Sequence, residues 1–334
     1  MTTRTRNTTF GWAAALSLSA LMTQAAPAGV FAFRIDNAGG SDGVDNDGQS
    51  FQQQWGSPTN WNLVSGVDDG GNGYPDATDT FTMDRTTLAN NSTRLTTESA
   101  PGSLNFVAGI TGTGTGNQDI VFKSRDFTIG DLTVLASANP FTIREERDKS
   151  LTINGVISGA GGLRLLRSGS FSDGVDPDEL FTIGGSSLNT ITGPIHLFND
   201  NAAQPGFWVA DKVGAFGQSS EVTLEGNSGA TGIQSLRITT SAIGGEGAID
   251  DDATIFRVGR QGLLSIDAGV NEAIGEGNLF VDLLSDGTYT EIAPGTYNNS
   301  EAWITGDGTV TVIPEPSSFA LVALGVLGLM RRKR

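Results

Sequence analysis

The segment Leu151-Thr-Ile-Asn-Gly-Val-Ile-Ser-Gly-Ala-Gly-Gly-Leu163 contains both of the patterns that decide the fold. Its first three residues alternate between apolar, threonine and apolar, which is the period of a strand with one buried face. Because side chains alternate across a strand, we expect the threonine to face solvent and its two neighbours to face a core. The same triplet recurs at Phe81-Thr-Met83, Phe127-Thr-Ile129, Leu132-Thr-Val134, Phe141-Thr-Ile143, Phe181-Thr-Ile183, Val222-Thr-Leu224 and Val310-Thr-Val312.

The second pattern, Ile157-Ser-Gly-Ala-Gly161, places two glycines after an isoleucine. Glycine accepts positive φ and close approach of the backbone, so we expect these positions at tight corners. Glycine-rich loops can also bind phosphate, but that requires a helix behind the loop, and no helical period follows here. The pattern recurs at unequal intervals, at Ile110-Thr-Gly-Thr-Gly114, Ile243-Gly-Gly-Glu-Gly247, Ile304-Thr-Gly-Asp-Gly308 and, shortened, Ile274-Gly-Glu-Gly277.

Short strands separated by irregular glycine corners predict an all-β fold. We favour a parallel β-solenoid, in which each rung buries its apolar residues on the next rung. With about 20–25 residues in each rung, on the order of a dozen rungs would fit between residues 33 and 312. A pair of β-sandwiches also uses short alternating strands and is the alternative fold.

The composition narrows the classes of function. The 334 residues carry a formal net charge of −17, which repels nucleic acid and anionic lipid headgroups. There is no cysteine, which excludes disulfides, thiol catalysis and thiolate metal sites. The single histidine, His196, alternates with Ile195 and Leu197, so we expect it to face outward on a strand, with no catalytic partner identifiable. We therefore expect no nucleic-acid partner and no enzymatic activity.

The first 28 residues have the three parts of a secretory signal peptide. Arg4 and Arg6 give a positive start, and the apolar run 12–22 is too short to span a bilayer. Small residues at Ala26 and Ala28 fit the positions before a cleavage site, while cleavage after Ala25 or Ala32 stays open. We expect this segment to be removed on export.

The last residues predict a short transmembrane helix. The apolar stretch 319–330 is followed by four consecutive cations, Arg331, Arg332, Lys333 and Arg334. Alone it falls short of the roughly 20 residues that cross a bilayer comfortably, but snorkelling basic side chains can extend it. The cations would hold this end in the cytoplasm and leave the body outside.

Pro314, Glu315 and Pro316, followed by this apolar helix and the basic cluster, resemble the PEP-CTERM sorting signal of Gram-negative bacteria that make exopolysaccharide. The resemblance implies recognition by an exosortase, a membrane thiol transpeptidase, with transient passage through the inner membrane and cleavage near the tripeptide. A plain C-terminal anchor is the alternative, with the same topology. The expected organisation is a signal peptide at 1–28, a body with an N-terminal cap at 29–313 and a sorting segment at 314–334.

The body carries a resemblance of its own. Ile157-Ser-Gly-Ala-Gly-Gly-Leu163, followed by Phe181-Thr-Ile-Gly-Gly-Ser-Ser-Leu-Asn-Thr-Ile-Thr-Gly193, resembles the autotransporter-associated β-strand repeat, and the stretch 208–224 fits its continuation. The resemblance implies a right-handed parallel β-helix of the kind found in exported passenger proteins. The stretch 168–180 departs from it as an insertion.

Two groups of residues are candidate binding sites. Trp55 and Trp61 lie in a segment that resembles the N-terminal cap of PEP-CTERM β-helix proteins. We interpret them as cap packing, and stacking on a glycan is the alternative.

The other group would bind calcium. Asp68, Asn72, Asp76 and Asp79 fall at positions 1, 5, 9 and 12 of an EF-hand-like register. Position 3 is glycine and no helices flank the loop, so solvated turns are the other interpretation. Apart from calcium, no cofactor is expected.

Three functions follow, in order of preference. The first is an exported, non-enzymatic structural or interaction protein of the cell surface or of an extracellular, exopolysaccharide- or biofilm-associated matrix. The second is a glycan-binding or calcium-dependent adhesive module. The third is a polysaccharide-degrading β-helix enzyme, which would require carboxylates that converge on one face.

Overall fold

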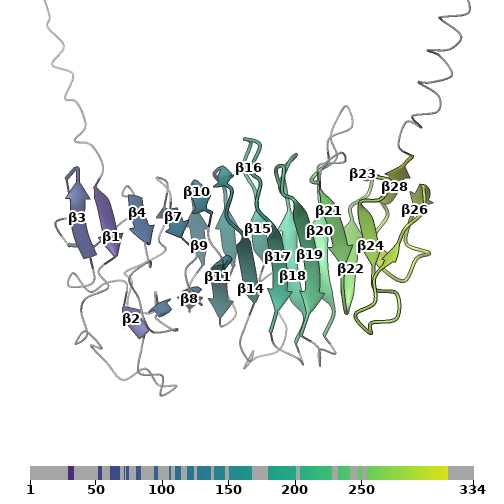
Figure 1. Cartoon of the computed structure of the whole chain (residues 1–334), viewed down its shortest axis with the longest axis horizontal. Helices are drawn as coiled ribbons and strands as arrows, with labels where there is room; N and C mark the ends of the chain where they lie inside the picture. Colours follow the sequence, from purple (N-terminus) through teal and green to yellow (C-terminus); the bar gives the residue numbers. More distant parts are fainter. Residues whose placement is uncertain are drawn as a thin grey trace, which may run out of the picture.

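The computed structural model describes most of the chain from Phe127 onward and short pieces before it (Figure 1). The described residues are 29–33, 52–54, 61–67, 71, 73–74, 80–83, 94–96, 105–106, 110–113, 119–123, 126–136, 139–146, 150–167, 180–200, 204–227, 232–240, 247–249 and 254–314. They form an elongated all-β body with β3 and β1 at one end and β26 and β28 at the other (Figure 1).

Three large sheets run along this body. Sheet 1 has the order β16 (Thr190–Ile191), β13 (Ile157–Gly159), β10 (Leu132–Leu135), β7 (Ile110–Thr113), β4 (Thr80–Met83), β1 (Val30–Phe33) and β3 (Trp61–Ser65). Sheet 2 has the order β2 (Gln52–Gln54), β5 (Arg94–Thr96), β8 (Asp119–Lys123), β11 (Phe141–Glu146), β14 (Leu163–Arg167), β17 (Ile195–Asn199), β19 (Glu221–Gly226), β21 (Ile255–Val258), β24 (Leu279–Val281) and β25 (Thr290–Glu291).

Sheet 3 has the order β27 (Ile304–Thr305), β22 (Gly262–Ile266), β20 (Gln234–Ile238), β18 (Gly206–Ala210), β15 (Phe181–Ile183), β12 (Leu151–Ile153), β9 (Phe127–Ile129) and β6 (Asn105–Phe106). A small sheet 4, of β23 (Asn271–Gly275), β28 (Thr309–Ile313) and β26 (Gly295–Tyr297), closes one end. Within the described residues every strand pair is parallel except β1 with β3, β24 with β25 and β26 with β28.

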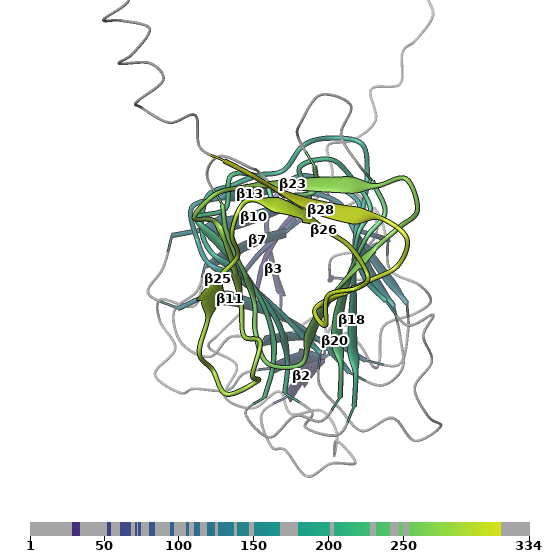
Figure 2. The same ribbon diagram turned by 90° about the vertical axis from the view of Figure 1, so that its right-hand side faces the viewer.

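The chain visits the three large sheets in turn. From β9 in sheet 3 it passes to β10 in sheet 1 and β11 in sheet 2, and then returns to sheet 3 as β12, which pairs in parallel with β9. We call one such passage a circuit. Viewed along the body, the sheets surround a common interior (Figure 2).

Ladders of equivalent apolar side chains fill that interior. In sheet 3, the register brings one residue from each strand into a single buried row: Phe127, Leu151, Phe181, Trp208, Leu236, Leu264 and Ile304. Burying one such side chain contributes about 1.5–3 kcal/mol. Each short strand is therefore stabilised mainly by the circuits on either side of it rather than by its own length.

The strand predictions from the apolar-threonine-apolar triplets are confirmed. All eight triplets lie in strands. Where side chains are described, the apolar residues are buried and the threonines partly exposed, with Thr142 the exception, since it is buried. The expected rung length is too short: Leu132 pairs with Ile157, 25 residues later, and Leu163 with Ile195, 32 residues later. The connections, rather than the strands of two to six residues, set this length.

The glycine pattern marks the ends of strands. In β13 the isoleucine begins the strand and Gly159 ends it with a φ of +103°. A Cβ at Gly159 would lie 2.1 Å from the Val134 carbonyl oxygen of the preceding circuit, and one at Gly161 would lie 2.2 Å from that of Leu135. The predicted close approach of the backbone is confirmed at these two positions.

The two predicted targeting segments lie outside the described residues, apart from Pro314. Across the ranges that the structure describes there is no α-helix, and accordingly none that is long and apolar enough to cross a membrane.

Candidate ligand-binding groove on the outer face of sheet 2

A groove of about 710 Å³ opens on the outer face of sheet 2, near the first residues of β11, β14, β17 and β19. Its floor is formed by Pro140, Gly162 and Pro194, each of which directly precedes a strand. A Cβ at Gly162 would lie 3.4 Å from Pro140 Cβ and 3.5 Å from Pro194 Cγ. The floor is therefore a continuous, narrow apolar strip from three successive circuits.

The polar side of the groove is built from one outward-facing row of sheet 2. The register places Arg164, His196, Thr223, Arg257 and Phe280 side by side on β14, β17, β19, β21 and β24. His196 faces outward between buried Ile195 and Leu197, as the alternation predicts. Neighbouring strands lie about 4.8 Å apart, so this row offers a polar or aromatic group at regular steps along the body.

Glu225 is held between a histidine and a tyrosine. Its Oε1 lies 3.0 Å from His196 Nε2, and the Tyr289 hydroxyl donates to its Oε2 at 3.4 Å. The hydrogen bond with His196 holds the pKa of Glu225 below its usual value, against the opposing effect of burial. Burial, reinforced by the charge of Glu225, raises the pKa of Tyr289 to about 12. At neutral pH the carboxylate is charged and the phenol is protonated.

Glu221, four residues earlier on β19, is held by a second set of groups. Its Oε1 accepts a hydrogen bond of 2.9 Å from Thr223 Oγ1, and its Oε2 lies 3.2 Å from Arg257 Nε. The Arg257 guanidinium also stacks near two rings, with Cζ 5.1 Å from the centroid of Phe280 and 5.2 Å from that of Tyr289. The arginine therefore connects the two ends of the polar wall.

The separation of the two carboxylates bears on chemistry. Four residues of strand at about 3.3 Å each place Glu221 and Glu225 about 13 Å apart along β19. Glycoside hydrolases hold their two carboxyl groups at about 5–5.5 Å or 6.5–9.5 Å. The hydroxyl next to His196 in the sheet belongs to Thr223, and it donates to Glu221 instead. The wall presents hydrogen-bonding groups in fixed positions rather than a paired acid and base.

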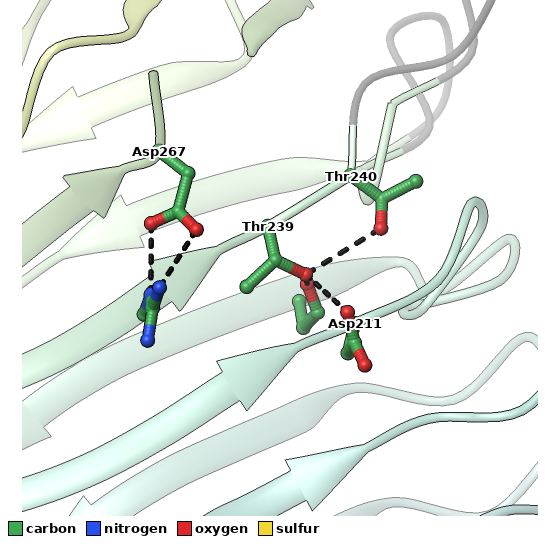
Figure 3. Close-up of polar contacts among 6 residues, drawn as sticks. Asp211, Thr239, Thr240 and Asp267 are labelled. Atoms are coloured by element: carbon green, nitrogen blue, oxygen red, sulfur yellow. Dashed lines mark hydrogen bonds and ion pairs between the residues drawn. The ribbon is translucent and has the colours of Figure 1, made fainter. Parts of the chain in front are cut away.

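A second polar cluster lies on the outer face of sheet 3 (Figure 3). Arg237 donates two hydrogen bonds of 2.8 Å to Asp267, one to each carboxylate oxygen. Thr239 donates to Asp211 and lies 3.4 Å from the Thr240 hydroxyl. Arg237 is about half exposed, and solvated pairs of this kind contribute 0–1 kcal/mol. We interpret this cluster as a satisfied surface, and it supplies a matched control for the groove.

The structure settles one of the two predicted tryptophans. Trp61 begins β3 and is 4% exposed within the hydrophobic core. A buried indole offers no face to a sugar ring, so the stacking alternative is corrected to core packing for Trp61. Trp55 lies outside the described residues.

The predicted calcium ligands Asp68, Asn72, Asp76 and Asp79 also lie outside the described residues. In the part of the chain that is described, no group of three or more acidic, histidine or cysteine side chains is placed to hold a metal ion.

Of the sorting and cleavage residues, only Pro314 is described. It is exposed and directly follows β28. Ala26, Ala28, Glu315, Pro316 and the final basic cluster lie outside the described ranges.

Sequence reasoning missed the polar wall of the groove. Alternation about Val222 and Leu224 could have placed Glu221, Thr223 and Glu225 on one outward face. No sequence pattern connects them with His196, Arg257 or Tyr289, because those contacts depend on the register between circuits.

Comparison with known proteins identifies the C-terminus. Residues 312–334 match the family described as the PEP-CTERM protein-sorting motif. This motif indicates export and sorting by an exosortase, and so points to the cell envelope or surface. No curated protein and no solved structure matches the chain.

Proposed function

We propose that this chain is an exported, non-catalytic structural or interaction protein that acts at the cell surface or in the extracellular polymer layer. The observation that carries the proposal is the sorting motif at residues 312–334, which overlaps the end of the last strand of the body. The exposed position of Pro314 directly after β28 would leave the sorting tripeptide accessible to a processing enzyme. An acidic body with a net charge of −17 for the whole chain suits a soluble, hydrated environment.

We further propose that the body is a right-handed parallel β-helix. The parallel return of β12 to β9, of β14 to β11 and of β13 to β10 supports this fold. A β-sandwich is built from antiparallel sheets instead. Right-handedness follows from the strong preference of crossovers between parallel strands in one sheet for that hand.

The absence of catalysis is part of the same proposal. The groove on sheet 2 is the strongest candidate for an active site among the described residues, and its carboxylates are too far apart for glycoside hydrolysis by the usual pair. The lowered pKa of Glu225 and the raised pKa of Tyr289 both lie far from neutrality, where general acid–base groups work best.

The test compares three forms of the chain expressed in its host. One is unchanged, one ends at Ile313, and one carries alanine at Pro314, Glu315 and Pro316. We expect only the unchanged chain to reach the cell surface or medium, with the body ending at Ile313 held in the periplasm and the alanine form held in the membrane. Equal distribution of all three forms would contradict sorting through the tail.

A further inference from the structure

The groove on sheet 2 is more ordered than a solvated surface requires. Both oxygens of Glu221 and both oxygens of Glu225 are engaged by neighbours in the groove, namely Thr223, Arg257, His196 and Tyr289. The side chains of the two ion pairs nevertheless remain 29–36% exposed. Groups that are fixed but still accessible can bind a ligand without the entropic cost of being ordered first.

The floor and the wall have different chemistry. Pro140, Gly162 and Pro194 form an apolar strip, and the wall beside it presents carboxylates, a guanidinium, an imidazole and a phenol. A pyranose ring has the same two sides, with C–H groups on its face and hydroxyls around its edge. Carboxylates accept hydrogen bonds from hydroxyls, and arginine donates to them.

The charge and the repeat of the groove select among glycans. Glu221 and Glu225 face Arg257 and His196, so the groove is close to neutral, while the chain as a whole carries −17. A polyanionic chain would be repelled at long range. The strand spacing of about 4.8 Å is close to the length of one sugar unit in an extended chain, and the groove crosses several strands.

We infer that the groove on the outer face of sheet 2 binds a neutral, hydroxyl-rich glycan chain that lies along the stack of strands. Sugar rings stack on the strip of Pro140, Gly162 and Pro194, and their hydroxyls bond to Glu221, Glu225 and Arg257. The inference rests on the proposed function only for the place where the glycan is met, which is outside the cell.

The experiment is titration calorimetry of the purified full-length chain with a panel of probes. The neutral probes are hexasaccharides of glucose, mannose and xylose with β-1,4, β-1,3 and α-1,4 linkages where they exist, and the acidic probe is hexagalacturonate. We expect at least one neutral hexasaccharide to bind with a Kd below about 1 mM and hexagalacturonate to bind more weakly.

Matched variants locate the binding. Arg257→Gln and Glu225→Gln should each weaken binding by about tenfold or more, since each removes a charged hydrogen-bonding group. Arg237→Gln and Asp267→Asn make the same changes in the solvated cluster on sheet 3 and should leave the Kd unchanged. Tyr289→Phe keeps the ring, loses one hydroxyl, and provides a second groove variant if Glu225→Gln does not fold.

The outcomes separate the two proposals. Binding by no neutral probe, tighter binding of hexagalacturonate, or equal weakening by groove and control variants would each overturn the glycan site. Cleavage of a bound hexasaccharide, followed by mass spectrometry of the probe, would leave the binding site standing and overturn the non-catalytic function.

Discussion

At the scale of single residues, Lys212 and Asn189 show how polar groups enter the interior. Lys212 is 3% exposed, and its Nζ donates to the Gly155 carbonyl at 2.9 Å and to Asn189 Oδ1 at 2.7 Å. Asn189 Oδ1 also accepts from the Ile157 amide, and its Nδ2 donates to the Ala215 carbonyl. Two side chains thus join three successive circuits where sheet 1 gives way to irregular backbone.

The pH dependence of stability follows from Lys212. Burial lowers its pKa to about 8 from 10.5, although Asp131 acts in the opposite direction. Below pH 8 both the folded and the unfolded chain hold the proton, and the cost of burying the charge is felt in full. Between pH 8 and 10.5 the unfolded chain holds more protons, so the free energy of unfolding from Lys212 rises with pH, by at most about 3 kcal/mol.

Urea unfolding at pH 7.5, 8.5 and 9.5 measures this effect. We expect the unchanged chain to gain stability over this range relative to Lys212→Met, which cannot titrate. Parallel curves for the two proteins would show that Lys212 does not carry the effect.

His196 shows how far sequence reasoning reaches for one residue. Its outward direction follows from alternation with Ile195 and Leu197, and the structure agrees. Its partner Glu225 lies on the next strand of sheet 2, 29 residues later, and the length of the connecting segment cannot be converted into a register from the sequence. The candidate site was therefore predictable in the orientation of its residues but not in their association.

At the scale of elements, the strands are predictable and their assembly is not. The eight triplets identify strands because alternation is local. Which strands pair depends on the sheet that the chain visits next, and this information is spread over connections of different length. The antiparallel partners β3, β25 and β26 were not predicted, although strands at the ends of sheets commonly depart from the regular pattern to protect an edge.

The glycine pattern gives a prediction at this scale. Gly159 and Gly277 both have positive φ, at +103° and +83°. A Cβ at Gly159 would lie 2.1 Å from a backbone oxygen, whereas one at Gly277 would meet nothing within 4 Å. We expect Gly159→Ala to lower the free energy of unfolding by at least about 2 kcal/mol more than Gly277→Ala, because only the first must push two circuits apart.

Thermal unfolding of the two variants under identical conditions measures the difference. Gly277→Ala controls for the conformational strain that both variants share. Equal losses would show that the close approach between circuits at Gly159 does not contribute to stability.

At the scale of the whole molecule, the chain is divided between an elongated β-sheet body and terminal segments that direct its transport (Figure 1). The sorting segment was predictable because its information lies in a short, contiguous pattern that a membrane enzyme reads as sequence. The all-β class was predictable for the same local reason. The ligand groove was not, since it belongs to a surface assembled from residues 140 to 289.

The most direct test of export and sorting is the intact mass of the chain recovered from its host, with medium, envelope and membrane fractions measured separately. We predict a mass in the medium or envelope that corresponds to a start near Gly29 and an end near Pro314–Pro316, with any new C-terminal modification visible as an added mass. A chain that retains Arg331–Arg334 and is found only in membranes would contradict sorting by cleavage and leave an anchored protein.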